Sequence, residues 1–506
     1  MLERKPKICF FLQRSYALTG HALACWLKEK YGVEEFCAYT GLRKMHEFLT
    51  SQRDVRYTSL LLDEDVHARY KDEKLDLIYL ERLEKEYGIP NVWPYLALDR
   101  EIMFNQAKRE YPYNTPRYSH EEMLRIFQVT AKAVINFLDR EKPDAVVFST
   151  VGNVPGYLLY EIAKKRGIQV HYILTAPFRD QIVVSEKFDS FTGVDALFRK
   201  RLANETKDSF YAEAERMLAD FRTSPIPYDQ KRTPEAQQVS RSKQLRFLAP
   251  QNFIRSLLWF VRFSVEYVFG NTRNDYTTVS PFYYALDHVK RKVRNLIGAS
   301  DLYDAFDPHE PYAYFALTYE PEISLLLLAP FAQDQITCIK NAARSLPVGW
   351  KLYVKEHPEM VHFRPRSYYK ELKKIPNVKL IDPRTSGFSL LRHTRLVFTI
   401  TGSAAWEGLI FGKPTIVFGN QFYNVLSMVK KCGDSATLPH LVKEQLEEFH
   451  LDETELLHFT AAMLADTATL PFIHLWEDEF NARKKKDGLE PLADLLAKKL
   501  GLIGRN

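Results

Sequence analysis

The feature that most constrains the fold is a strand–helix–strand rhythm that occurs in both halves of the chain. In the first half, an apolar run at 145–149 is followed by a Gly-containing turn at 151–153 and a helical stretch at 155–166. Gly167 separates this helix from a second apolar run at 168–174. Two strands joined by a helix at this spacing predict a parallel sheet with helices on its faces.

The same rhythm restarts near residue 312 and continues through several units. The pattern predicts further strands at 7–13, 314–317, 350–355, 378–381, 395–399 and 415–418, and helices at 120–141, 333–346, 389–393, 404–411, 444–467 and 491–500. Consecutive strand–helix units of this kind are typical of doubly wound sheets. We therefore expect an α/β, GT-B-like fold with two Rossmann-like domains and a helical basic insertion between them.

The expected organisation has four parts. Residues 1–195 form an N-terminal Rossmann-like domain, 196–310 a helical basic insertion or linker, 311–470 a C-terminal Rossmann-like domain, and 471–506 C-terminal helices. Within the insertion, residues 231–300 contain 12 Lys and Arg against 4 Asp and Glu, while the whole chain has a net charge of +6. Such a segment indicates an anionic partner (phosphate, a membrane surface or nucleic acid) or simply a solvated basic face.

The insertion contains a strongly apolar helical stretch at 251–270. Arg255, Arg262 and Glu266 are spaced along it, and Trp259 lies near its middle. Three placements fit this pattern: a helix packed in the core, a bridge between domains, or an interfacial helix with its rings in lipid and its arginines at the headgroups. Packing in the core is the prediction.

Cysteine usage and hydropathy bear on the compartment. The five cysteines are scattered and form no CxxC, so reduced thiols are expected rather than a disulfide framework or a zinc ribbon. The apolar run at 8–12 is too short for the core of a signal peptide, and no apolar stretch reaches the roughly 18 residues of a spanning helix. A cytoplasmic protein is expected, either soluble or in contact with a membrane surface.

Polar residues follow the strand at 350–355, where the carboxyl edge of a parallel sheet binds ligands. Lys355 ends this strand, and Glu356, His357 and Pro358 come next. The imidazole of His357 is suited to donate to a phosphate oxygen and to assist a leaving nucleotide. The alternative interpretation is a His-Pro turn that only terminates the strand.

A small hydroxyl-bearing loop follows the strand at 395–399. Thr401 and Ser403 supply hydroxyl groups, and Gly402 allows the backbone to approach an anion. Glu407 lies one helical turn later, where an acidic side chain suits a ribose diol. Alternatively, Ser403 only caps the helix.

Carboxylates after the strand at 314–317 are candidate catalytic groups. Glu320 and Asp334 are each able to act as a base or nucleophile in glycosyl transfer, and neither is preferred. The alternative for Glu322 and Asp334 is a stabilising charge at a helix N-terminus.

Known cofactor motifs are missing from the sequence. It contains no GxxxxGK[ST], HExxH or GxSxG, and no GxGxxG opens the chain. One DxD, formed by Asp63, Glu64 and Asp65, is predicted to be a solvated acidic loop rather than a metal site. We therefore expect neither a metal ion nor another cofactor.

Four stretches resemble the bacterial capsule polysaccharide biosynthesis family, which includes β-Kdo transferases that use CMP-Kdo. They are YFALTYEPE at 314–322, LAPFAQDQI at 328–336, LPVGWKLYVKEHP at 346–358 and TGSAAWEGLIFGKPTIVFGNQFY at 401–423. The resemblance implies a GT-B glycosyltransferase whose donor nucleotide phosphate is held by His357 and the 401–403 loop. It leaves the catalytic carboxylate unassigned.

These observations predict a cytoplasmic transferase, associated with the inner face of the plasma membrane, that moves a CMP-activated keto-acid sugar such as Kdo onto a capsule or other surface polysaccharide. The expected acceptor is a glycan or lipid-linked glycan, bound near residues 149–153 and Arg179. Nucleic acid is not an expected partner. The alternatives are a UDP-sugar GT-B transferase or epimerase, a CDP-polyol phosphotransferase, and a non-catalytic glycan-binding scaffold.

Overall fold

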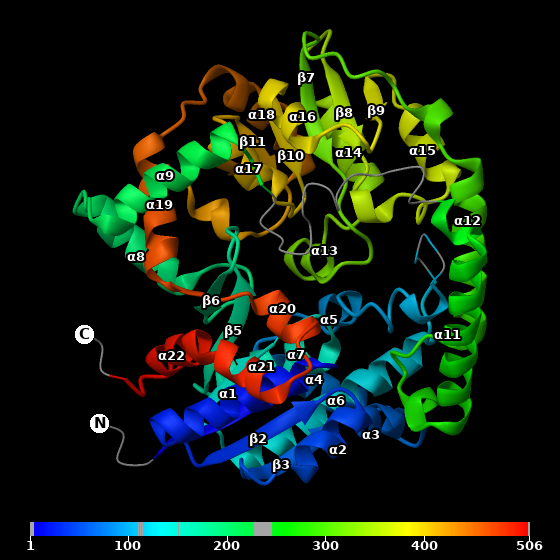
Figure 1. The fold of residues 1–506 in the computed structure, drawn as a ribbon, viewed down its shortest axis with the longest axis vertical. Coiled ribbons are helices and arrows are strands. Elements are labelled where there is room, and N and C mark those ends of the chain that lie inside the picture. Colours follow the sequence, from blue (N-terminus) through cyan, green and yellow to red (C-terminus); the bar gives the residue numbers. More distant parts are fainter. Residues whose placement is uncertain are drawn as a thin grey trace.

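The chain forms two β-sheets that lie in separate lobes (Figure 1). The computed structural model describes residues 5–109, 111, 113, 115–149, 151–226 and 245–503. Thr150, within the expected acceptor region, and residues 231–244 of the basic segment lie outside the described residues.

The N-terminal sheet has seven strands in the order β13-β6-β5-β4-β1-β2-β3. They are β1 (Lys7–Leu12), β2 (Glu35–Thr40), β3 (Tyr57–Leu62), β4 (Ala145–Phe148), β5 (Gln169–Thr175), β6 (Gln181–Ser185) and β13 (Thr467–Thr469). Strands β1 to β5 are parallel, whereas β6 and β13 pair antiparallel at one edge. All residues of β1 and β4 are buried, as expected for apolar strands covered on both faces.

The C-terminal sheet has six parallel strands in the order β12-β11-β10-β7-β8-β9. They are β7 (Tyr312–Ala316), β8 (Lys351–Lys355), β9 (Val378–Ile381), β10 (Leu396–Thr399), β11 (Thr415–Val417) and β12 (Val429–Lys431). Both sheets reverse their strand order once, between β1 and β4 and between β7 and β10. The predicted pair of doubly wound domains is therefore confirmed, and each reversal opens a crevice at the carboxyl ends of the strands.

Helices cover these sheets at positions near those predicted. They include α1 (Tyr16–Tyr31), α3 (Asp63–Ala68), α4 (Leu77–Tyr87), α6 (His120–Glu141), α7 (Val154–Lys165), α14 (Gln335–Arg344), α15 (Arg366–Lys373), α16 (Gly387–His393) and α17 (Ala404–Ile410). The single helix expected at 444–467 is instead two, α18 (Leu438–Glu447) and α19 (Glu453–Ala465). The Asp452 side chain accepts the Glu455 N–H and starts a new helix there.

The end of the chain returns to the N-terminal lobe. Helices α20 (Phe472–Glu477), α21 (Ala482–Gly488) and α22 (Glu490–Lys499) lie beside α1 (Figure 1). Leu492 and Leu496 of α22 are fully buried in one apolar cluster with Ile8 and Leu12 of β1. The helices expected as a separate C-terminal part thus complete the core of the first lobe.

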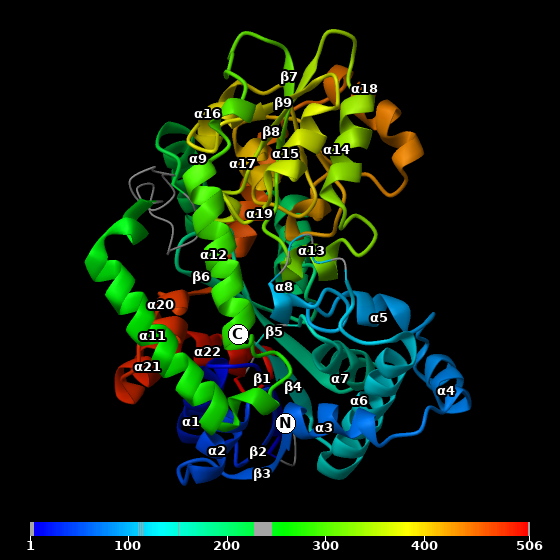
Figure 2. The same cartoon turned by 90° about the vertical axis from the view of Figure 1, so that its right-hand side faces the viewer.

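The described parts of the basic insertion are mainly helical, as predicted, but its apolar helix is not packed in the core. Helix α11 (Pro250–Phe269) has no buried residue, and α12 (Pro281–Ile297) follows it and runs along the side of both lobes (Figures 1 and 2). The prediction of core packing is therefore wrong. An apolar helical run has the same composition in a core and at an interface, and only its neighbours distinguish the two.

The DxD stretch is also not a solvated loop. It begins helix α3 directly after β3, and Asp63 and Glu64 are buried. Tyr39 and Tyr276 each donate a hydrogen bond of 2.9 Å to Asp63. The loop prediction failed because the preceding strand was not recognised.

Across the described residues, no helix combines the length and hydropathy needed to cross a membrane.

Replacing Leu496 by Ala tests whether α22 belongs to the first lobe. Because Leu496 is fully buried among N-terminal residues, the variant should lose about 2–5 kcal/mol of unfolding free energy. Hydrogen exchange in β1 should accelerate together with the lower denaturation midpoint. The control Lys498→Ala should change neither, and slow exchange in β1 of the Leu496 variant would contradict this packing.

Candidate functional site

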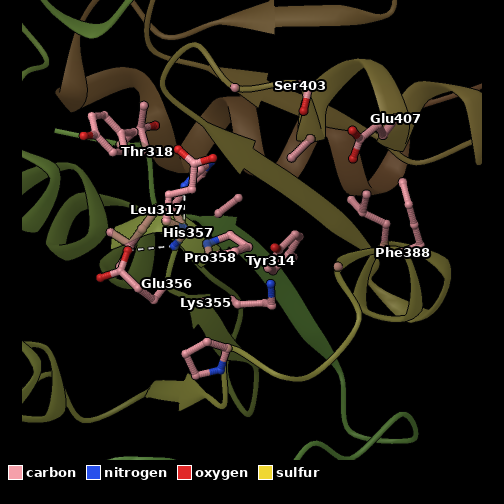
Figure 3. Close-up of a pocket in the computed structure, with 18 of the residues that line it drawn as sticks. Tyr314, Leu317, Thr318, Lys355, Glu356, His357, Pro358, Phe388, Ser403 and Glu407 are labelled. Carbon is pink, nitrogen blue, oxygen red and sulfur yellow. Dashed lines mark hydrogen bonds between the residues drawn. The ribbon is translucent and has the colours of Figure 1, made fainter. Parts of the chain in front are cut away.

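A cavity of about 970 Å³ lies at the strand reversal of the C-terminal sheet. Its walls come mainly from the segments that follow β7, β8, β9 and β10, and Arg100 reaches it from the N-terminal lobe. Figure 3 shows part of this lining, with Ser403 and Glu407 on one side of the view and Glu356 and His357 on the other. The two strand ends singled out in the sequence therefore meet in one cavity between the lobes.

The backbone after β8 orients His357. His357 is the N-cap of the short helix η6 (Pro358–Met360), and its ring Nδ1 accepts the Glu359 N–H at 3.3 Å. Because Nδ1 accepts, the neutral ring carries its proton on Nε2. His357 lines the cavity and is therefore a suitable donor to an anionic group there.

A buried ion pair holds this strand end in place. Arg364 and Glu356 are each about 1% exposed and form a salt bridge. Arg364 also donates to the Thr318 carbonyl at 2.7 Å, and Tyr369 donates to Glu356 at 2.8 Å. The guanidinium thus joins the segment after β7 to the segment after β8. Both segments line the cavity.

The 401–403 loop is held by its own backbone contacts. The Gly402 N–H donates to Thr399 Oγ1 at 2.9 Å, and a Cβ at this position would lie 2.7 Å from that oxygen. Glycine is therefore required by close approach. The Ser403 side chain makes no cap hydrogen bond, so the capping alternative does not hold.

Two buried hydroxyl groups on the cavity wall have no hydrogen-bond partner among the described residues. They are Thr318 Oγ1 and Thr401 Oγ1. A buried polar atom without a partner costs about 1–3 kcal/mol. A bound polar ligand would supply the missing partners.

Lys355 and Glu407 place two titratable groups on the wall. Burial lowers the pKa of Lys355 to about 8, although the carboxylates of Glu356 and Glu407 act in the opposite direction. Burial raises the pKa of Glu407 to about 7, against a hydrogen bond with Ser403 and the charge of Lys355. Both groups therefore change charge near neutral pH.

The two predicted catalytic carboxylates do not line this cavity. Glu320 is held by Arg364 at 3.1 Å and accepts a hydrogen bond from Gln335. Asp334 is exposed and caps α14, where it accepts the Ile336 N–H and the Thr337 hydroxyl. Their catalytic roles stay predictions, and their present partners account for both as structural groups.

Several lining residues were missed in the sequence. Arg384 and Ser386 follow β9, so the rule of polar residues after each strand would have found them. Arg100 carries no such signal, because it reaches the cavity from the other lobe through folding alone.

A second cavity, of about 60 Å³, lies at the strand reversal of the N-terminal sheet. Arg100 lines both cavities, so the two are neighbours, and Gly152 and Asn153 of the expected acceptor region line the second one. Ser149 instead donates to the Phe11 carbonyl, and Arg179 lines neither cavity and pairs with Asp180.

This second cavity holds a carboxyl group that no motif indicated. Burial, together with the nearby charge of Asp99, raises the pKa of Glu101 to about 7. The Ala107 N–H donates to one of its oxygens at 2.9 Å. A carboxyl group with this pKa is suited to accept a proton near neutral pH.

A group of three possible metal ligands lies outside both cavities. His21, Cys25 and Asp54 present their ligand atoms within 4.8 Å of one another. Burial raises the pKa of the Cys25 thiol to about 12, which opposes the thiolate that a metal requires.

Comparison with known proteins gives one match within the sequence. Residues 329–460 match the family described as capsule polysaccharide biosynthesis protein. No curated protein matches the chain. The matched segment includes His357, the 401–403 loop and Glu407, so the resemblance seen in the sequence is confirmed for this part of the chain.

Three solved structures are among those similar to the chain. The KpsC β-Kdo 2,4 transferase of Thermosulfurimonas dismutans is 17% identical with a TM-score of 0.38, covering 65% of this chain and 82% of its own. The β-Kdo 2,7 transferase of the same protein is 12% identical with a TM-score of 0.35, over 77% and 95%. The UDP-GlcNAc 2-epimerase of Methanocaldococcus jannaschii is 13% identical with a TM-score of 0.25, over 91% and 98%. Because these TM-scores are below 0.5, the likenesses assign no activity.

The site and the family match define the class of the C-terminal lobe. It is a doubly wound domain with a ligand cavity at its strand reversal, paired with a second domain in the GT-B manner. Within this lobe, residues 329–460 match the model of the capsule polysaccharide biosynthesis protein family.

Removing the buried guanidinium tests what holds the site. Arg364→Ala leaves the Glu356 carboxylate buried without its partner and should lower the free energy of unfolding by about 3–5 kcal/mol. The matched control is Arg366→Ala, which breaks an exposed pair with Asp301. Chemical denaturation should show a much smaller loss of unfolding free energy for the control. Equal losses in the two variants would contradict a stabilising role for the buried Arg364–Glu356 pair.

Proposed function

We propose that the chain is a GT-B glycosyltransferase that binds a nucleotide-activated sugar in the larger cavity and transfers the sugar to a glycan. The observation that carries the proposal is the meeting of His357 with the 401–403 loop in one interlobe cavity of about 970 Å³. Doubly wound domains bind nucleotides at this crevice. The volume suits a nucleotide sugar, since small-molecule sites fall within about 300–1,000 Å³.

The donor proposed is a CMP-activated keto-acid sugar such as CMP-Kdo, a choice that rests on the resemblance of four sequence stretches to a family that includes CMP-Kdo-dependent transferases. His357 would donate from Nε2 to the phosphate, while Thr401 and Ser403 offer hydroxyl groups to the same anion. When the glycosidic bond of the donor breaks, negative charge develops on the departing phosphate, and these donors stabilise it. Glu407 would accept hydrogen bonds from the ribose. No metal ion or cofactor is needed in this scheme.

The acceptor proposed is a surface glycan or lipid-linked glycan, bound on the side of the second cavity. Glu101 would accept the proton of the attacking hydroxyl, and Arg14 and Arg100 would hold anionic groups nearby. We propose a cytoplasmic enzyme that works at the inner membrane surface.

His357→Ala tests the donor site. Loss of the phosphate donor should reduce sugar transfer by at least about 100-fold, measured as CMP release from the donor. The variant should retain the denaturation midpoint of the wild type, since His357 is only partly buried. Unchanged turnover would refute the role.

Thermal shifts distinguish the nucleotides. About 100 Kd of the correct nucleotide stabilises the protein by roughly 2.7 kcal/mol, so CMP should raise Tm more than UDP or CDP. A smaller Tm shift by CMP in the His357→Ala variant would locate CMP binding at the larger cavity. A preference for UDP would favour a UDP-sugar transferase or epimerase, and a preference for CDP a polyol phosphotransferase. Glycan binding without any nucleotide response would identify a non-catalytic scaffold.

The pH profile tests Glu101. Because its pKa is raised to about 7, the carboxyl is protonated below that pH and the rate should rise as pH passes through 7. Glu101→Gln should lower kcat roughly 10²–10⁴-fold and abolish this rise of the rate with pH, the acidic limb of the profile. Asn153→Ala serves as a control in the same cavity that should keep the limb. If the Glu101→Gln variant retains both the rate and the acidic limb, Glu101 is not the general base.

A further inference from the structure

We propose that helix α11 docks the protein on an anionic membrane surface, with its apolar face among the lipid chains. This inference deepens the proposed function, since a lipid-linked acceptor gives the docking its purpose.

The outer face of α11 is almost entirely apolar. Nine large apolar side chains of α11 are exposed. One of them, Trp259, lies on the other side of the helix, and the remaining eight are Phe253, Ile254, Leu257, Leu258, Val261, Val265, Val268 and Phe269. At about 100° per residue they occupy one arc of about 160°. Such a continuous face on a helix that stands at the edge of the molecule is what an interfacial helix presents to lipid (Figure 2).

The opposite side of α11 is the side that packs. Trp259 and Phe263 contact the Tyr284 ring of α12, with ring centroids 4.9 Å and 5.5 Å away. Phe260, Phe263 and Tyr267 are only partly exposed. The contacts with α12 therefore support the helix from behind, and the residues that the structure describes leave the apolar arc exposed.

Charge selects the chemistry of the occupant. Residues 245–298 carry eight Lys and Arg against three Asp and Glu. Arg255 and Arg262 are exposed and follow the apolar arc directly on one border of the helix. Cations beside an apolar face match anionic headgroups above acyl chains, each contributing about 1 kcal/mol near the surface. Arg291 and Arg294 of α12 are engaged within the protein, with Asp287 and the Phe363 carbonyl, so Arg255 and Arg262 of α11 carry the charge argument.

Helix α12, against which α11 packs, is joined to both lobes. Asp287 of α12 pairs with Arg109 of the N-terminal lobe at 3.1 Å. Arg294 of α12 donates to the carbonyl of Phe363, the residue before the buried Arg364 of the C-terminal lobe. Docking through α11 would therefore hold both cavities at a set distance from the membrane.

Vesicle binding by the full chain tests the inference without any sugar donor. Phosphatidylglycerol–phosphatidylcholine vesicles should bind the wild type, phosphatidylcholine alone should bind it much less, and added salt should weaken binding. Leu258→Glu with Val265→Glu should reduce binding at least about tenfold. Both positions are exposed, so the fold should persist. The matched control is Ile78→Glu, an exposed apolar residue of α4 in the N-terminal lobe, which should bind as the wild type does.

A site-specific label gives the second readout. The five native cysteines are buried, so a Val261→Cys variant should take an environment-sensitive dye at that position. Its emission should shift to the blue with anionic vesicles, whereas the same dye on Ile78→Cys should not respond.

Three results would overturn the proposal. They are absence of binding to anionic vesicles, binding unaffected by the two glutamates, and a blue shift at position 261 that appears with protein concentration alone. The last result would show that a second copy of the chain covers α11. A failed nucleotide test alongside normal vesicle binding would refute the enzyme and leave the docking intact.

Discussion

The site depends on one buried ion pair, between Arg364 and Glu356. Both side chains are almost fully excluded from water, where an unpaired charge would cost several kcal/mol. The pair is tolerated because the guanidinium also satisfies the Thr318 carbonyl and Glu320, and Tyr369 satisfies Glu356. These contacts join two strand ends and thereby position His357.

The second constraint is the shared topology of the two sheets. Each reverses its strand order once, and each reversal carries a cavity. Arg100 lines both cavities, so the donor and acceptor sides that we propose meet at one residue. A two-lobed transferase requires this arrangement, because the two substrates approach from opposite lobes while the reacting atoms must come within bonding reach.

The chain also crosses between its lobes more than a simple linear order of domains requires. Strand β13 and helices α20 to α22 return to the first lobe after the second is complete. Helix α12 spans the side of both and is paired to each. The relative position of the lobes is thus set by several connections, and the apolar helix α11 rests on one of them.

Local patterns in the sequence determined the alternating strands and helices, because burial in a parallel sheet demands short apolar runs with turns between them. They also placed His357 and the 401–403 loop at strand ends, and both line the cavity. Long-range packing decided the rest. Arg100 reaches the larger cavity from the other lobe, Glu101 lines the second cavity, and Asp334 is turned outward to cap α14. The described residues leave the apolar face of α11 exposed. Periodicity along a helix shows which face is apolar, but what covers that face depends on residues distant in the sequence.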